Sequence, residues 1–281
     1  MRALLAGAAI AAAGIISGCG ASQAIEPVAR AADVTSKVPG YRIQATTSVG
    51  TAGGSVQVAM SGIINRADRS GQMTAHESIA GHLLTLSERF SGLTFYLDAS
   101  GLPGAAQATH GRRWLKMDMS RTLGSLGLGS LSTTSSDPSQ FVDYLRAVGA
   151  NTKRVGTATV RGASTTQYHA VVDLSTYPRL VRPADRAGAR RGISTLETVL
   201  GSHTLAMDVW IGPDKLVRRL RFGYPECVNN QRLSFSMTMD LYDYGPQPAT
   251  QVPPASQSYD LTPMLSAAMK NIKFGCSAGS A

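Results

Sequence analysis

Few residues in this sequence have the types and spacing that catalysis requires. The five histidines are dispersed, and no pair has the spacing of metal ligands on one helix. The sequence contains no nucleophile elbow, zinc-protease motif, phosphate-binding loop or dinucleotide-binding glycine pattern. It therefore predicts a protein that is not an enzyme, with no cofactor and no metal.

The cysteines carry the remaining reactive chemistry. Before Cys19 stand a positive Met1-Arg2, an uncharged apolar run from Ala3 to Ile16, and Ser17-Gly18, which is the pattern of a secretory signal. The apolar run is too short for a membrane span of ~20 residues. Residues 1–18 are therefore expected to be a signal peptide. A cysteine after Ser-Gly also resembles the lipobox of bacterial lipoproteins, in which this cysteine is acylated; the alternative is ordinary secretion.

The other two cysteines, Cys227 and Cys276, form an even pair. In an oxidising compartment such a pair predicts a disulfide.

The chain is basic, with 27 Lys and Arg against 18 Asp and Glu and a formal charge of +9. A basic excess of this size favours binding to an anionic membrane surface, an acidic polymer or nucleic acid. Nucleic acid is the least available of these to a protein outside the cell membrane. A solubilising charge without any partner remains an alternative.

One basic cluster recurs at helical spacing within an irregular segment, 175–192. We interpret it as a contact for lipid headgroups or the membrane, with a solvated loop as the alternative. Pro183 and Gly188 argue against one continuous helix there, and a short helix is expected over 193–200. The cluster consists of Arg179, Arg182, Arg186 and Arg190.

The elements that must position these residues are mostly strands. From Tyr41 onward apolar and polar residues alternate in short runs separated by turns, which predicts an antiparallel sheet. Asp137-Pro138 is typical of a helix start, and the following residues place an apolar stripe on one side of that helix. We divide the chain into a lipid-anchored tether (19–37), one domain (38–245), and a proline-rich linker with a C-terminal helix and tail (246–281).

The last strands have one wholly apolar face with large, unbranched side chains. Methionine adapts to irregular shapes, so this face is a candidate wall for a flexible apolar guest, although a filled core would have the same pattern. The predicted ligand cavity is lined by Phe141, Leu145, Leu205, Met207, Val209, Phe235, Met237 and Met239.

The order of these parts resembles the LolA-like lipoproteins of actinobacterial envelopes, the LppX/LprAFG family. Each motif is weak alone, and the resemblance rests on their order through most of the chain. Three features depart from the pattern: the Cys227/Cys276 pair, the arginine-rich insertion and the tail beyond residue 261. The matching motifs are the Cys19 lipobox, residues 111–118, Asp137-Pro138, residues 160–162 leading to Tyr168 and Asp173, the strand pair at 209–211 and 216–218, and 253–256 before Asp260-Leu261.

The resemblance implies an α+β fold: a curved antiparallel β-sheet forming a half-open barrel, with helices covering the concave apolar face. It implies a lipoprotein on the extracytoplasmic face of the bacterial cell membrane that binds acylated lipid or glycolipid and carries it across the cell envelope. Its partners would be that lipid, the membrane through the anchor, and an envelope transporter, with no nucleic acid. The alternative is a non-catalytic structural or interaction module with a closed core.

Overall fold

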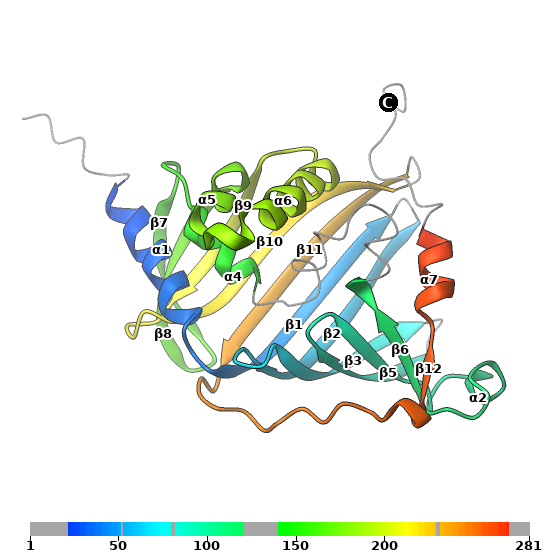
Figure 1. Ribbon diagram of the computed structural model, residues 1–281. Helices are drawn as coiled ribbons and strands as arrows, with labels where there is room; N and C mark the ends of the chain where they lie inside the picture. Colours follow the sequence, from blue (N-terminus) through cyan, green and yellow to red (C-terminus); the bar gives the residue numbers. More distant parts are fainter. Residues whose placement is uncertain (1–21, 52, 80–81, 121–139, 229–230, 270–281) are drawn as a thin grey trace, which may run out of the picture.

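The chain folds around one large curved sheet (Figure 1). The computed structural model describes residues 22–51, 53–79, 82–120, 140–228 and 231–269. Across these residues twelve strands pair in the order β12-β6-β5-β4-β3-β2-β1-β11-β10-β9-β8-β7, so the sheet has two ends and is not closed. All neighbours are antiparallel except β12 and β6, which are parallel. The predicted fold class is confirmed. The strands are β1 (Gly40–Thr51), β2 (Gly54–Asn65), β3 (Ser70–Ile79), β4 (His82–Ser91), β5 (Thr94–Asp98), β6 (Trp114–Asp118), β7 (Lys153–Val160), β8 (Ala163–Asp173), β9 (Thr204–Ile211), β10 (Val217–Val228), β11 (Gln231–Tyr242) and β12 (Ser258–Asp260).

The alternation of the sequence sets the two faces of the sheet. In β1, Ile43 and Ala45 are buried while Arg42 and Gln44 are exposed, because successive side chains of a strand point to opposite faces. Ile43 pairs with Leu241 of β11 on one side and with Gly62 of β2 on the other. The apolar face is the concave one, on which most of the helices lie.

Most of the helices gather over one half of this face, and α7 (Thr262–Met269) contacts β6 at the other end of the sheet (Figure 1). Phe141, Val142, Leu145 and Ala189 point into a core shared with β8 to β11. The described helices are α1 (Ser22–Thr35), α2 (Ala105–Ala108), α4 (Gln140–Tyr144), α5 (Tyr177–Leu180), α6 (Arg186–Leu200) and α7 (Thr262–Met269), with short 3-10 turns at Leu145–Ala147, Leu174–Thr176, Pro183–Asp185 and Ala255–Gln257.

Helix α1 corrects the expectation of a tether over 19–37. Val28, Ala31 and Ala32 are 0% exposed, and the Thr35 hydroxyl oxygen accepts a hydrogen bond from the backbone N–H of Val217 at 3.0 Å. Alanines at the spacing of one helix face allow close packing, and the sequence analysis mistook their low hydrophobicity for a lack of pattern. Residues 22–35 are therefore part of the domain.

Helix α6 is longer than the predicted helix over 193–200. It begins at Arg186, directly after the turn that contains Pro183, and it runs through Gly188. A proline is tolerated before the first helical turn, and one glycine costs a helix only about 1 kcal/mol. Burial of Ala189, Ile193 and Leu200 against the sheet offsets that cost.

The C-terminal part is more than the expected linker and tail. The proline-rich segment (residues 246–254) leaves β11 and runs past the ends of the intervening strands to reach β12 (Figure 1). Asn65 Nδ2 donates to the carbonyl oxygen of Pro248 at 2.9 Å, and Arg89 Nη1 donates to that of Gln251 at 2.9 Å. Since β12 then pairs with β6, the domain extends beyond residue 245.

One glycine in the sheet makes room for a core aromatic ring. A Cβ atom on Gly71 of β3 would lie 2.5 Å from Cζ of Phe90 on the neighbouring strand, a distance that no side chain can accept. The Phe90 ring lies over this gap and stacks on Phe95 with their centroids 5.8 Å apart.

None of the helices in the described part of the chain has the length and apolar character needed to cross a membrane.

Candidate functional site

The covered half of the concave face is a filled core. Of the eight residues predicted to line a cavity, five have no more than 3% of their surface exposed. Leu145 lies in the 3-10 turn after α4, the other four lie on β9, which α1 contacts, and on β11, and all five belong to one apolar cluster. Such positions present side chains to the protein itself and offer a guest no surface. These five are Leu145, Leu205, Met207, Val209 and Met239.

The other three predicted residues, Phe141, Phe235 and Met237, lie where the covered half ends. All three are only partly buried. The Phe141 ring is 4.3 Å from that of Phe222 on β10, and the Phe235 ring stacks on Tyr224 at 4.8 Å between centroids. These aromatic contacts form the inner border of the uncovered half.

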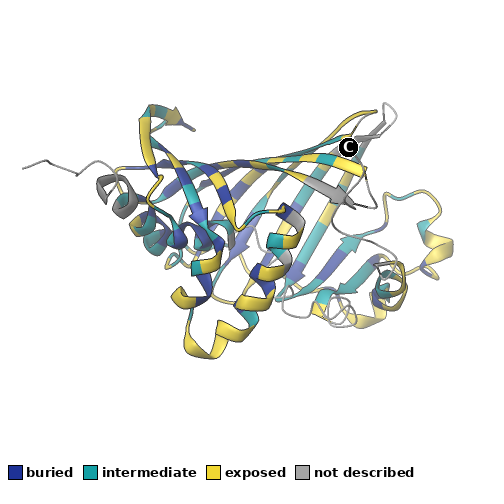
Figure 2. Ribbon diagram, turned by 90° about the horizontal axis from the view of Figure 1, so that it is seen from above, coloured by how far each residue is buried: buried dark blue, intermediate teal, exposed yellow. Residues whose placement is uncertain are grey.

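The uncovered half consists of the same face of β1 to β6. In the described part of the chain, α1 and α6 contact β7 to β10 beside this region, and α7 contacts β6 at its far side (Figures 1 and 2). Val56 is 48% exposed and the apolar side chains named below are half-buried, whereas Ile43, Ile64, Met73, Phe90 and Phe95 on the same face are buried. Contiguous exposed apolar surface of this kind marks a site for a ligand or partner. We call this set the open apolar face: Val56, Val58, Met60, Leu84, Leu86, Leu97, Leu115 and Met117.

The register shows that this face is continuous. Val56 pairs with Val49 of β1, which pairs with Phe235 of β11, so the face joins the aromatic border directly. On the other side Leu97 of β5 pairs with Leu115 of β6. The alternation occurs in all these strands, and the predicted cavity residues lie mostly on the last ones because those strands are more apolar. Alternation identifies a buried face, but it does not tell which part of that face the helices cover.

Polar residues interrupt the open apolar face, and Glu77 of β3 occupies the register position between Val58 and Leu84. Glu88 stands between Met73 of β3 and Leu97 of β5, and burial raises the pKa of its carboxyl group above the ordinary value. The Thr47 hydroxyl is buried and has no hydrogen-bond partner among the described residues. A carboxyl group and a hydroxyl group both form hydrogen bonds, so both can orient a polar atom of a bound molecule.

The predicted basic cluster lies on the helices beside this face. Arg179 ends α5, Arg186 and Arg190 lie one turn apart on α6, and all three side chains are exposed. Arg182 is also exposed but donates to Asp185 at 2.8 Å between Nε and Oδ2. Leu180, 39% exposed, stands within the cluster. Figure 2 shows exposed residues along these helices on the side away from the sheet.

Several predicted features lie outside the described residues. They are the signal peptide with Cys19, the Asp137-Pro138 helix start, and Cys276 with the rest of residues 270–281. Cys227 is in β10, opposite Arg232 of β11. The described residues contain no group of three or more side chains that could hold a metal ion.

Comparison with solved structures finds several that are similar to this chain. One is LprF from Mycobacterium bovis, with 13% identity over 84% of this chain and 99% of that one and a TM-score of 0.44. A second is the Mycobacterium tuberculosis lipoprotein LppX, with 14% identity over 82% and 99% and a TM-score of 0.46. A third is a putative outer membrane lipoprotein-sorting protein domain from Vibrio parahaemolyticus, with 8% identity over 83% and 94% and a TM-score of 0.28.

No protein-family model and no curated protein matches the chain. LprF and LppX belong to the family that the sequence motifs resemble. These likenesses carry no argument about what this chain binds, which rests on its own residues.

Proposed function

We propose that this protein binds acylated lipid or glycolipid through the open apolar face and carries it across the cell envelope, held to the membrane by lipid on Cys19. The observation that supports this most is the uncovered half of the concave face, where β2, β4 and β5 present apolar side chains that remain partly exposed. An acyl chain that leaves water for such a surface gains about 0.8 kcal/mol per buried CH₂ group.

The basic cluster supports contact with a membrane. Residues 177–200 contain five arginines and two acids, and the exposed ones stand beside Leu180 on helices that border the open apolar face. Basic side chains near an anionic lipid surface contribute about 1 kcal/mol each. Docking through these helices would bring the apolar face close to the bilayer from which a lipid leaves, or to an envelope transporter.

A photoreactive fatty acid tests the proposed site. The probe carries a diazirine on its acyl chain, and the Cys19→Ala variant is used because it has no acceptor for an anchor. We expect crosslinks on peptides from β2, β4 and β6, and their loss in a Val56→Asp variant. Val155 of β7 is also an exposed strand valine, 58% exposed, so Val155→Asp is the matched control. Crosslinks that survive Val56→Asp, or that spread evenly over the surface, would refute the assignment.

A second candidate is an interaction module with a closed core. It is favoured by the five predicted cavity residues that are fully packed beneath the helices. In that case the open apolar face would bind a protein partner, and the fatty-acid probe would not react there above the level of the Val155 region.

A further inference from the structure

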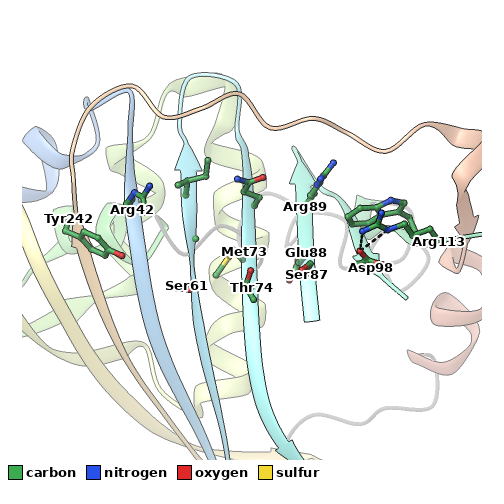
Figure 3. A pocket seen from close by; sticks show the side chains of 14 residues that line it. Arg42, Ser61, Met73, Thr74, Ser87, Glu88, Arg89, Asp98, Arg113 and Tyr242 are labelled. Carbon is green, nitrogen blue, oxygen red and sulfur yellow. Dashed lines mark hydrogen bonds and ion pairs between the residues drawn. The ribbon is translucent and has the colours of Figure 1, made fainter. Parts of the chain in front are cut away.

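The convex face of the sheet carries a groove that the lipid proposal does not use (Figure 3). Its volume is about 440 Å³, within the range of ligand pockets. It crosses the strands from Tyr242 of β11 to Trp114 of β6. With neighbouring strands about 4.8 Å apart, this is about 29 Å along the sheet, so the groove suits an extended molecule.

The floor of the groove is polar. Ser61, Gln72, Thr74 and Ser87 line it with hydroxyl and amide groups that both donate and accept hydrogen bonds. Ile63 also lines it but is only 6% exposed, so no apolar pocket opens from the floor. The strands below are paired on both sides, and a peptide cannot add to them as a further strand.

Three arginines give the groove its charge. Arg42 lies at one end, Arg89 about 14 Å further at three strand spacings, and Arg113 at the other end. Asp98, the carboxylate on this face of the groove, accepts from Arg113 Nε at 3.0 Å and Nη2 at 2.6 Å. Glu88 is on a lining strand, but its position in the alternation directs its side chain to the concave face.

Arg89 is held in place for binding. Its guanidinium carbon lies 4.8 Å from the centre of the Trp114 ring, and one N–H binds the carbonyl of Gln251 in the proline-rich segment. No carboxylate pairs with it among the described residues. Arg42 has only a distant contact, 3.7 Å from Nε to Oδ2 of the exposed Asp243. Guanidinium groups of this kind bind sulfate, phosphate or carboxylate groups strongly.

We propose that this groove binds an acidic oligosaccharide, whose anionic groups pair with Arg42 and Arg89 and whose hydroxyls meet the polar floor. Sugar units supply hydroxyls between the charges, which matches the residues between the arginines. A peptide would need apolar pockets or a free strand edge, and the groove has neither. The groove is on the face opposite the open apolar face, so a test of oligosaccharide binding is independent of lipid binding.

Calorimetric titration of the Cys19→Ala protein with a short dextran sulfate tests this site. We expect saturable binding that weakens with salt, and no binding of neutral dextran of the same length. Arg42→Gln with Arg89→Gln should weaken binding about tenfold or more, since each charge-assisted hydrogen bond is a strong one. The control Lys153→Gln with Arg154→Gln removes the same charge from exposed positions on β7 and should change affinity less than about twofold.

Three results would overturn the proposal: no binding of dextran sulfate, equal weakening by both double variants, or equal binding of a poly-glutamate peptide. The last two would mean attraction by net charge alone. Arg42→Gln by itself provides a further test, because Arg42 is exposed and its loss leaves the Arg89 contacts with Trp114 and Gln251 intact. Unchanged affinity in a folded Arg42→Gln variant would also count against the site.

Discussion

Glu88 is a carboxyl group among apolar neighbours, and its burial raises its pKa. The folded state therefore holds this proton more tightly than the unfolded state does, so stability falls as pH rises from the unfolded pKa through the folded one. Glu88→Gln should be stabilising relative to the parent at about pH 8 and lose that advantage at about pH 4, as measured by urea unfolding. A stabilisation by Glu88→Gln that does not change with pH would contradict a raised pKa of Glu88 in the folded state.

Asp208 on the convex face titrates in the opposite sense. Burial works to raise its pKa, but hydrogen bonds from His169 at 3.0 Å and from Arg221 at 2.6 Å outweigh this and lower it. The stability that it contributes is present above the unfolded pKa and is lost as pH falls through the folded one. Asp208→Asn should thus lower the melting temperature at pH 7, and the gap to the parent should narrow in acid. If the difference in melting temperature between Asp208→Asn and the parent were the same at pH 7 and in acid, the ion pairs of Asp208 would not be its cause.

Among the elements, α1 is the one whose role differs most from expectation. Val28 is fully buried against the sheet, while Arg30 on the same helix is exposed. A charge at position 28 would be buried without a partner, so Val28→Asp should reduce the free energy of unfolding by roughly 3–5 kcal/mol. Arg30→Asp, the surface control, should stay within about 0.5 kcal/mol. If the two variants were equally stable, the segment would be a tether after all.

Helix α6 gives a prediction about membranes. Arg186 and Arg190 are exposed one turn apart. Replacing both by Gln should reduce sedimentation of the Cys19→Ala protein with anionic vesicles roughly tenfold or more, at about 1 kcal/mol per arginine. The matched control changes Lys153 and Arg154, exposed at the far edge strand β7, to Gln. An equal loss in both double variants would indicate attraction by net charge, without a preferred face.

At the scale of the elements, the sequence predicted what local patterns determine. The alternation from Tyr41 onward identified the strands because a half-buried strand needs a period of two. The sequence did not predict α1 or β12, for physical reasons. The buried side of α1 is mostly alanine, which carries little hydrophobic signal, and the pairing of β12 with β6 joins residues more than a hundred positions apart.

At the scale of the molecule, the sequence located the apolar face but not its uncovered part. Met207 and Met239 lie on the late strands, whose one face is wholly apolar in the sequence. In the fold both side chains are buried in the core. Val56 and Val58 lie on β2, whose exposed positions are more polar, and they remain at least partly exposed because α1 and α6 contact β7 to β10. Coverage of a face is a tertiary property, which no window of sequence contains.

The central claim, that the uncovered half of the concave face holds hydrocarbon chains, is tested most directly by native mass spectrometry of the Cys19→Ala protein purified from its own host. We predict a mass that exceeds the chain by that of a lipid, retained in Val155→Asp and lost in Val56→Asp. A bare protein mass that does not change when acylated lipid is added, or lipid retained equally by both variants, would contradict the account.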